Sequence, residues 1–289
     1  MAVSSVEVRV EAIGVIGGGR MGAGIAQVFA ATGARVVVVE GDASAADAAR
    51  ERVLTGLRRA AERGKLDGTP EEVIERVSVC TAIDQLPSDA ALVVEAVPEV
   101  AKLKVDVLTA AERAVGEGTV LATNTSSLSI TELAAALAKP DRFLGMHFFN
   151  PVPASKLVEV VLGPETAASV RDQVLNWVGV LGKSEVVVRD SPGFATSRLG
   201  VMLGLEAIRM LEEGVADAES IDRAMELGYR HPMGPLRSTD LVGLDVRLAI
   251  AEYLASTLGD RFEPPRLLRE KVEKGELGRK TGKGFHDWS

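Results

Sequence analysis

A glycine-rich stretch near the amino terminus has the spacing of a turn that binds phosphate groups. Gly17, Gly19 and Gly22 follow an apolar run at residues 12–16 in the order G-x-G-x-x-G. Such a turn needs the first glycine for tight bending, the second for close approach of the backbone to a pyrophosphate, and the third for packing of a helix against a strand. The amino terminus of that helix faces the anion. The stretch therefore predicts a dinucleotide site.

An acidic residue after the next apolar run supports this prediction. Glu40 ends a run of valines at residues 36–39. A carboxylate at this point accepts hydrogen bonds from an adenosine ribose and repels a 2′-phosphate, so we predict NAD rather than NADP. The alternative is a glycine turn in a fold that has lost its cofactor, and the combination of strand, helix and acid disfavours it.

One histidine has a position suited to proton transfer. Oxidation of an alcohol needs a base for the hydroxyl proton, while a nicotinamide accepts the hydride. An imidazole, with a pKa of about 6.5, can take that proton near neutrality. His147 ends a strand-like run at residues 143–146, whereas His231 and His286 lie farther along the chain. A histidine followed by two phenylalanines is also common in a protein core, and that alternative stays open.

Two further polar groups are candidates for the same site. Glu159 interrupts an apolar strand-like run at residues 157–161. A carboxylate there suits a histidine, because it fixes the ring tautomer and stabilises the imidazolium; an outward-facing residue of an edge strand is the alternative. The segment 124–127 (Asn-Thr-Ser-Ser) follows another strand-like run, which places it at the same sheet edge as His147. It could equally cap a helix that begins at Leu128.

The elements that position these residues alternate along the first half of the chain. Short β-branched runs are separated by stretches of helical composition or helical periodicity. This alternation predicts an α/β fold with a doubly wound, Rossmann-type parallel sheet. The predicted strands are 12–16, 35–39, 77–81, 91–95 and 119–122, and the predicted helices are 23–31, 43–63 and 100–115.

The pattern changes near Pro192, because residues 194–274 show helical patterns without a convincing strand. We therefore predict an NAD-binding Rossmann-type domain at 1–190 and an all-helical domain at 191–289. The predicted helix 195–213 is apolar on more than one side, which suits a core helix or a helix in a subunit interface. The other predicted helices of this domain are 217–227, 240–257 and 266–274.

Composition sets limits on the class of protein. With 289 residues, 46% of them hydrophobic, the chain can bury the cores of two domains. A net charge of -8 disfavours nucleic-acid binding. The single cysteine, Cys80, forms no internal disulfide, and no set of cysteines and histidines predicts a metal site. Residues 1–9 lack a signal-peptide pattern and no apolar run reaches the roughly 20 residues of a membrane helix, so we expect a cytoplasmic protein.

Motifs spread over almost the whole chain match one enzyme family. They are Val-Ile-Gly-Gly-Gly-Arg-Met-Gly-Ala-Gly at 15–24, Val-Glu-Ala-Val-Pro-Glu at 94–99, Asn-Thr-Ser-Ser-Leu at 124–128, His-Phe-Phe-Asn-Pro-Val-Pro at 147–153, Leu-Val-Glu-Val at 157–160, Asp-Ser-Pro-Gly-Phe at 190–194 and Arg-Lys-Thr-Gly-Lys-Gly-Phe at 279–285. Together they resemble the L-3-hydroxyacyl-CoA dehydrogenase family, in its short single-function form typified by 3-hydroxybutyryl-CoA dehydrogenases. The resemblance implies NAD-dependent oxidation of (S)-3-hydroxyacyl-CoA to 3-oxoacyl-CoA, and the reverse reduction, in fatty acid β-oxidation. It also implies an acyl-CoA held between the domains and a homodimer formed through the helical domain.

The resemblance assigns roles to individual residues. It implies that His147 is the base and that Glu159 orients it, while Ser126 and Asn150 contact the substrate oxygen and the nicotinamide region. Coenzyme A phosphates are expected near Arg52, Arg59 and Arg63, for which a solvated basic helix face is the alternative. The residues expected at the cofactor are Gly17, Gly19, Arg20, Met21, Gly22, Glu40, Glu99, Lys104, Ser126, Asn150 and Lys280.

One position departs from the family pattern. Ser197 stands where the family commonly has an asparagine that contacts substrate. A hydroxyl donates one hydrogen bond, lacks the second donor of the amide, and can act through water. Ser197 is therefore kept as a substrate contact.

The acyl group is not identified by the motifs. A butyryl-sized chain is the first expectation, and 3-hydroxyadipyl-CoA is the rival. Two other functions stay open, namely a non-catalytic, crystallin-like NAD-binding relative and a dehydrogenase of a free hydroxy acid or sugar acid. The intact catalytic positions argue against the non-catalytic relative.

Overall fold

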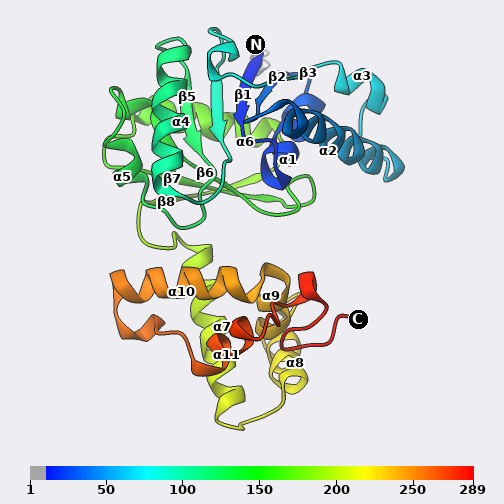
Figure 1. The fold of residues 1–289 in the computed structure, drawn as a ribbon, viewed down its shortest axis with the longest axis vertical. Helices are drawn as coiled ribbons and strands as arrows, with labels where there is room; N and C mark the ends of the chain where they lie inside the picture. Colours follow the sequence, from blue (N-terminus) through cyan, green and yellow to red (C-terminus); the bar gives the residue numbers. More distant parts are fainter. Residues whose placement is uncertain (1–10) are drawn as a thin grey trace, which may run out of the picture. The chain divides into compact units, whose positions relative to one another are not determined.

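The computed structural model describes residues 11–289 of the chain (Figure 1). The segment expected to lack a signal peptide, residues 1–9, lies outside the described residues. The chain forms two compact units that divide between Asp190 and Ser191, here called the sheet unit and the helical unit. Within residues 11–289, no helix is both long and apolar enough to cross a membrane.

The sheet unit is built on one sheet with the strand order β3-β2-β1-β4-β5-β6-β7-β8. Neighbouring strands are parallel except for β6 and β7, which are antiparallel. The central strands are continuous apolar runs because helices bury both faces of such a sheet. The doubly wound fold is thus confirmed, with one antiparallel pair added. The strands are β1 (Ala12–Ile16), β2 (Arg35–Val39), β3 (Val77–Cys80), β4 (Leu92–Glu95), β5 (Val120–Thr123), β6 (Phe143–Phe148), β7 (Leu157–Leu162) and β8 (Ser184–Arg189).

Three helices of this unit pack apolar residues against one face of the sheet. Ile25 and Phe29 of α1, Leu57 of α2 and Trp177 of α6 belong to a single core cluster with one face of the strands. Helix α1 begins directly after Gly19, three residues before the predicted start at residue 23. The helices are α1 (Arg20–Ala31), α2 (Ala43–Glu62), α3 (Pro70–Ile74), α4 (Ala101–Ala114), α5 (Ile130–Ala134) and α6 (Ala168–Val180), with short 3₁₀ turns at Ile83–Gln85 and Pro140–Arg142.

The helical unit has its own apolar core. Val201, Leu205 and Ile208 of α7 are buried in it, whereas Leu199 of the same helix is 70% exposed, so α7 is a core helix with an apolar residue left on its surface. The helices are α7 (Thr196–Glu212), α8 (Ala218–Gly228), α9 (Pro235–Val242), α10 (Leu244–Leu258) and α11 (Arg266–Glu273), with 3₁₀ turns at Asp260–Phe262 and Arg279–Thr281.

The prediction of one helix over residues 240–257 is wrong. Gly243 separates α9 from α10 and has a φ of 104°. An α-helix needs a negative φ, and only glycine adopts this positive value readily because it lacks a Cβ. The chain therefore turns at Gly243, and Asp240 belongs to the end of α9 rather than to the start of a longer helix.

Candidate active site

A buried histidine and a buried glutamate form a hydrogen-bonded pair at the antiparallel strands. His147 on β6 lies opposite Glu159 on β7 in the strand register. The ring Nδ1 of His147 is 2.7 Å from Oε2 of Glu159, and the two residues are 5% and 0% exposed. Because a carboxylate only accepts, Nδ1 carries the proton that it donates, which makes Nε2 the basic nitrogen of the neutral ring. The pair has the arrangement of a general base and its orienting acid.

The structure excludes the edge-strand alternative for Glu159. β8 pairs with β7 along its length, so Glu159 belongs to an inner strand and faces away from solvent. His147 is buried and hydrogen-bonded to an acid, an arrangement that suits both a base and a satisfied core histidine, so its role as the base stays a prediction. Phe149 also contacts the His147 ring, with centroids 4.4 Å apart.

The polar segment after β5 reaches the same edge of the sheet. The side-chain oxygen of Asn124 accepts a hydrogen bond of 2.9 Å from the backbone N–H of Phe148, next to His147. β5 and β6 are parallel neighbours, so their carboxyl ends meet there. The residue that caps α5 is Ser129, whose hydroxyl accepts from Glu132, and not a residue of the segment 124–127.

One carboxylate holds the backbone of this segment. Oε1 of Glu99 accepts hydrogen bonds from the hydroxyl of Thr125 at 2.5 Å, from the backbone N–H of Ser126 at 2.9 Å and from the N–H and hydroxyl of Ser127 at 3.2 Å. Burial acts to raise the pKa of the Glu99 carboxyl, but the Lys104 ammonium and these hydrogen bonds outweigh it and hold the pKa below its usual value. Glu99 is therefore a charged anchor that fixes the position of Ser126.

Lys104 is buried and forms ion pairs with Glu99 and with a second acid, Glu95. Its ammonium lies 2.8 and 3.0 Å from the oxygens of Glu95 and 3.3 Å from Glu99. Glu95 is fully buried and also accepts from the hydroxyl of Thr123 and the N–H of Val97. Glu95 is not among the residues predicted at the site. Its signal was an acid at the end of the otherwise apolar strand 91–95, of the same kind that singled out Glu159.

The glycine turn fits a dinucleotide. Gly17 has a φ of 93°, and a Cβ on it would lie 2.8 Å from the carbonyl oxygen of Ala96. A Cβ on Gly22 would lie 1.7 Å from the carbonyl oxygen of Gly17, so α1 could not pack so closely with any other residue. Apart from Gly19 itself and its two chain neighbours, no described residue has an atom within 4 Å of the Cβ position of Gly19, where a pyrophosphate needs room.

Glu40 lies at the end of β2, beside the same turn. Its Oε1 accepts a hydrogen bond of 2.7 Å from the backbone N–H of Gly18. Arg52 donates to the carbonyl oxygen of Gly18 at 3.2 Å, so the turn is held from both sides. Arg20 is exposed and Met21 half-buried in the first turn of α1. These placements suit the expected cofactor contacts.

The remaining candidates are distributed over the two units. Asn150 is exposed, three residues after His147 in the loop that follows β6. Arg59 and Arg63 are exposed at the end of α2. Ser197 lies in the first turn of α7, and the ammonium of Lys280 is 2.6 Å from Asp245, both in the helical unit. The roles expected of these residues stay predictions.

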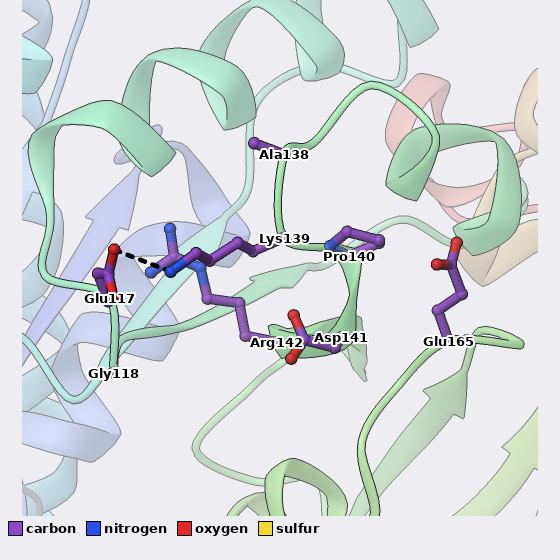
Figure 2. Close-up of a pocket in the computed structure, with 8 residues that line it drawn as sticks. All are labelled: Glu117, Gly118, Ala138, Lys139, Pro140, Asp141, Arg142 and Glu165. Carbon is purple, nitrogen blue, oxygen red and sulfur yellow. Dashed lines mark ion pairs between the residues drawn. The ribbon is translucent and has the colours of Figure 1, made fainter.

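A separate surface hollow lies at the other end of the strands (Figure 2). Its lining comes from the segments that lead into β5 and β6, including Pro140 and Gly118. Lys139 and Glu117 form an ion pair of 2.9 Å across it. Because ligands of α/β sheets bind at the carboxyl ends of the strands, this hollow has no part in the site built around His147.

Comparison with known proteins accounts for both units. Residues 12–191 match the family described as 3-hydroxyacyl-CoA dehydrogenase, NAD binding domain, and residues 193–288 match 3-hydroxyacyl-CoA dehydrogenase, C-terminal domain. A probable 3-hydroxybutyryl-CoA dehydrogenase of Bacillus subtilis is 42% identical over 281 residues, which cover 96% of this chain and 98% of that protein.

Solved structures show the same likeness. The crystal structure of FadB2 from M. tuberculosis shares 40% sequence identity and a TM-score of 0.93, over 98% of this chain and 100% of that chain. The (S)-3-hydroxybutyryl-CoA dehydrogenase PaaH1 from Ralstonia eutropha shares 40% identity and a TM-score of 0.91, over 97% and 99%. Sequence and structure agree over nearly the full length, and the chain belongs to the 3-hydroxyacyl-CoA dehydrogenase family of NAD-dependent oxidoreductases.

Proposed function

We propose that the chain oxidises the 3-hydroxyl group of a short (S)-3-hydroxyacyl-CoA with NAD, and reduces the 3-oxoacyl-CoA in the reverse direction, with His147 as the base. The hydrogen bond between His147 and Glu159 carries the proposal, because it gives a buried imidazole the tautomer that a base needs. Relatives named 3-hydroxybutyryl-CoA dehydrogenase, at 42% identity, favour a four-carbon acyl group as the reference substrate.

The chemistry divides between the bound cofactor and two side chains. Bound NAD supplies the acceptor for the hydride that leaves C3. Nε2 of His147 removes the hydroxyl proton as the C3–H bond breaks and the C3–O double bond forms. The imidazolium so produced lies 2.7 Å from the Glu159 carboxylate, which stabilises its charge. In the reverse direction His147 returns the proton to the oxygen.

Ser126 follows β5 and Asn150 follows β6, the neighbouring strand that carries His147. We assign the two residues to the substrate oxygen and the nicotinamide region. Glu99 fixes Ser126 through its backbone N–H. Lys104 acts through Glu99, because its ammonium is buried and paired with the carboxylates of Glu95 and Glu99. These assignments predict that loss of Glu99 moves Ser126 and lowers kcat more than it changes the binding of NADH.

Three arginines on α2 and directly after it support a site for coenzyme A phosphates. Arg52, Arg59 and Arg63 are spaced by seven and four residues, so they share one side of the helix. Arg52 at one end of this stripe touches the glycine turn through Gly18. Guanidinium groups bind phosphates bidentately. Raised salt should therefore increase KM for the thioester more than KM for NADH.

The helical unit supports assembly into a homodimer. Leu199, Leu227 and Tyr229 are each at least 70% exposed, and large apolar side chains of this kind favour burial against another protein surface. A second copy of the chain is the partner we propose. Light scattering on the purified protein should give twice the chain mass of 30.5 kDa, and a monomer at micromolar concentration would contradict the dimer.

The function is tested by following NADH absorbance with acetoacetyl-CoA as substrate. NADPH in place of NADH and free acetoacetate in place of the thioester are the parallel controls. We expect rapid NADH loss that requires the thioester. Tight NADH binding without turnover of any 3-oxoacyl-CoA would contradict the proposal and favour the non-catalytic alternative, while turnover of free acetoacetate would favour a dehydrogenase of free acids.

A further inference from the structure

A buried lysine of the sheet unit has no acidic partner. Lys183 directly precedes β8 and is 9% exposed. Among residues 11–289, no ion pair involves its ammonium, whereas the buried ammonium of Lys104 is paired with two carboxylates. Burial lowers the pKa of Lys183. A buried cation without a counter-ion costs free energy, so the neutral groups that it binds indicate what it contributes.

The groups that Lys183 binds are two carbonyl oxygens of the loop between β6 and β7. Residues 149–156 form this loop. Nζ of Lys183 donates to the carbonyl oxygen of Val152 at 2.6 Å and to that of Ser155 at 2.5 Å. An ammonium group has three donors, so one side chain can bind both carbonyl groups at once. Lys183 therefore holds the loop against the start of β8.

One apolar side chain of the loop packs into the core. Of residues 150–156, Val152 is the only buried one, and it belongs to the core cluster of the sheet unit. Its side chain lies against α1, because a Cβ on Gly24 would lie 2.9 Å from the Cβ of Val152. Lys183 binds the carbonyl group of this same residue. The two contacts together fix the loop relative to the helix that begins at the glycine turn.

The loop carries a residue expected at the reacting groups. Asn150 comes two residues before Val152 and three residues after His147. It is exposed, and its side chain makes no hydrogen bond to any of residues 11–289. The backbone of the loop, which Lys183 holds, therefore sets the position of the Asn150 amide. Such a position matters for the rate, because a misplacement of about 1 Å can lower it by about 100-fold.

We propose that Lys183 is a positioning residue of the reaction, which holds the loop at residues 149–156 so that Asn150 reaches the substrate oxygen and the nicotinamide region. The proposal rests on the proposed function, which assigns Asn150 to these groups. In this role Lys183 acts through the loop backbone and not by contact with the substrate. It should therefore affect kcat more than the binding of NADH, for which the expected contacts include the glycine turn and Glu40.

The test is a double-mutant cycle in the full chain, with acetoacetyl-CoA and NADH as substrates. Lys183→Met keeps an unbranched apolar side chain but removes the donors, and it should lower kcat by about 10- to 100-fold. NADH binding, measured by fluorescence, should change far less. In the Asn150→Ala background the same substitution should lower kcat by at most about twofold, because Lys183 then has no amide left to position. Lys156→Met, which removes an exposed lysine of the same loop, should keep the wild-type kcat.

A second variant covers poor folding of Lys183→Met. Lys183→Gln keeps a donor on a side chain that is one bond shorter, so an intermediate kcat is expected and the cycle can be run with it. Equal losses of kcat in the wild-type and Asn150→Ala backgrounds would overturn the proposal, because a purely structural lysine affects both alike. Wild-type kcat in Lys183→Met or in Asn150→Ala would also overturn it. Failure of the wild-type protein to turn over any 3-oxoacyl-CoA would instead overturn the proposed function.

Discussion

His147 on β6 and Glu159 on β7 lie directly opposite each other across the antiparallel strand pair, with 2.7 Å between Nδ1 and Oε2. The register of this pair decides the chemistry. A slip of one residue would turn Glu159 to the other face of the sheet and leave the imidazole without its acid. Helix α6 and strand β8 cover β7, so both the register and the burial of Glu159 are properties of the fold.

The carboxylate of Glu159 should matter for turnover more than for binding. Glu159→Gln keeps a hydrogen-bond acceptor for Nδ1 but removes the charge that stabilises the imidazolium. We expect kcat to fall by about 100-fold, within the range for general acid-base catalysis, with a smaller change in KM. Steady-state kinetics of acetoacetyl-CoA reduction measure both. Glu185→Gln, on the neighbouring strand and exposed, is the control. A variant with unchanged kcat would show that Glu159 does not assist the base.

Glu40 should set the preference for NAD. Its carboxylate, at the end of β2, accepts a hydrogen bond from the N–H of Gly18. A 2′-phosphate bound there would be repelled by the negative charge of this carboxylate. Glu40→Ala should raise the kcat/KM ratio of NADPH to NADH by at least about tenfold, which corresponds to about 1.4 kcal/mol. Glu62→Ala, exposed at the end of α2, should leave the ratio as it is. Wild-type protein that used NADPH better than NADH would contradict the assignment of Glu40.

Lys104 should stabilise the sheet unit far more than its neighbour Lys102. Lys104→Met leaves the buried carboxylate of Glu95 without its cation, and removal of one partner of a buried pair costs about 3–5 kcal/mol. Lys102→Met on the same helix breaks only an exposed pair with Asp106, which contributes about 0–1 kcal/mol. Urea unfolding measures both free energies. Equal effects of the two substitutions would show that the buried pair of Lys104 and Glu95 does not stabilise the sheet unit.

The contribution of Glu99 should depend on pH. The folded pKa of this carboxyl lies below its usual value of 4.5, so its charged form contributes stability above that value and the contribution is lost as pH falls through the folded pKa. Glu99→Gln should therefore destabilise the protein at pH 7, and the difference from wild type should shrink below about pH 4.5. Urea unfolding at several pH values measures this, with Glu62→Gln as the control. A difference that stays constant down to pH 3 would contradict the assignment.

Much of the fold followed from the sequence because its signals are local. The glycine turn and the valine run before Glu40 each span only a few residues. The fold class, the NAD cofactor and the reaction class implied by the motifs are confirmed. β8 and α6 were not predicted. Val186 and Val187 of β8 are both partly exposed, so that strand lacks the apolar alternation of a half-buried one.

Other features depend on contacts that sequence order does not display. The break at Gly243 needs a positive φ, and an isolated glycine within a helical pattern does not reveal it. The chemistry of His147 and Glu159 predicted their pairing, but only the antiparallel register of β6 and β7 places them opposite each other. The burial of Lys104 depends on Glu95 lying beneath it. A lysine in a helical segment otherwise predicts an exposed side chain.

The most direct test of the account is the turnover number of His147→Gln with acetoacetyl-CoA and NADH, measured beside the wild-type protein. Glutamine keeps a polar side chain at this position but cannot take up or return the proton. We predict a kcat lower by about 10²–10⁴-fold, the range for loss of a general base, with NADH binding retained as measured by fluorescence. A variant with nearly wild-type kcat would contradict the central claim that His147 transfers the proton.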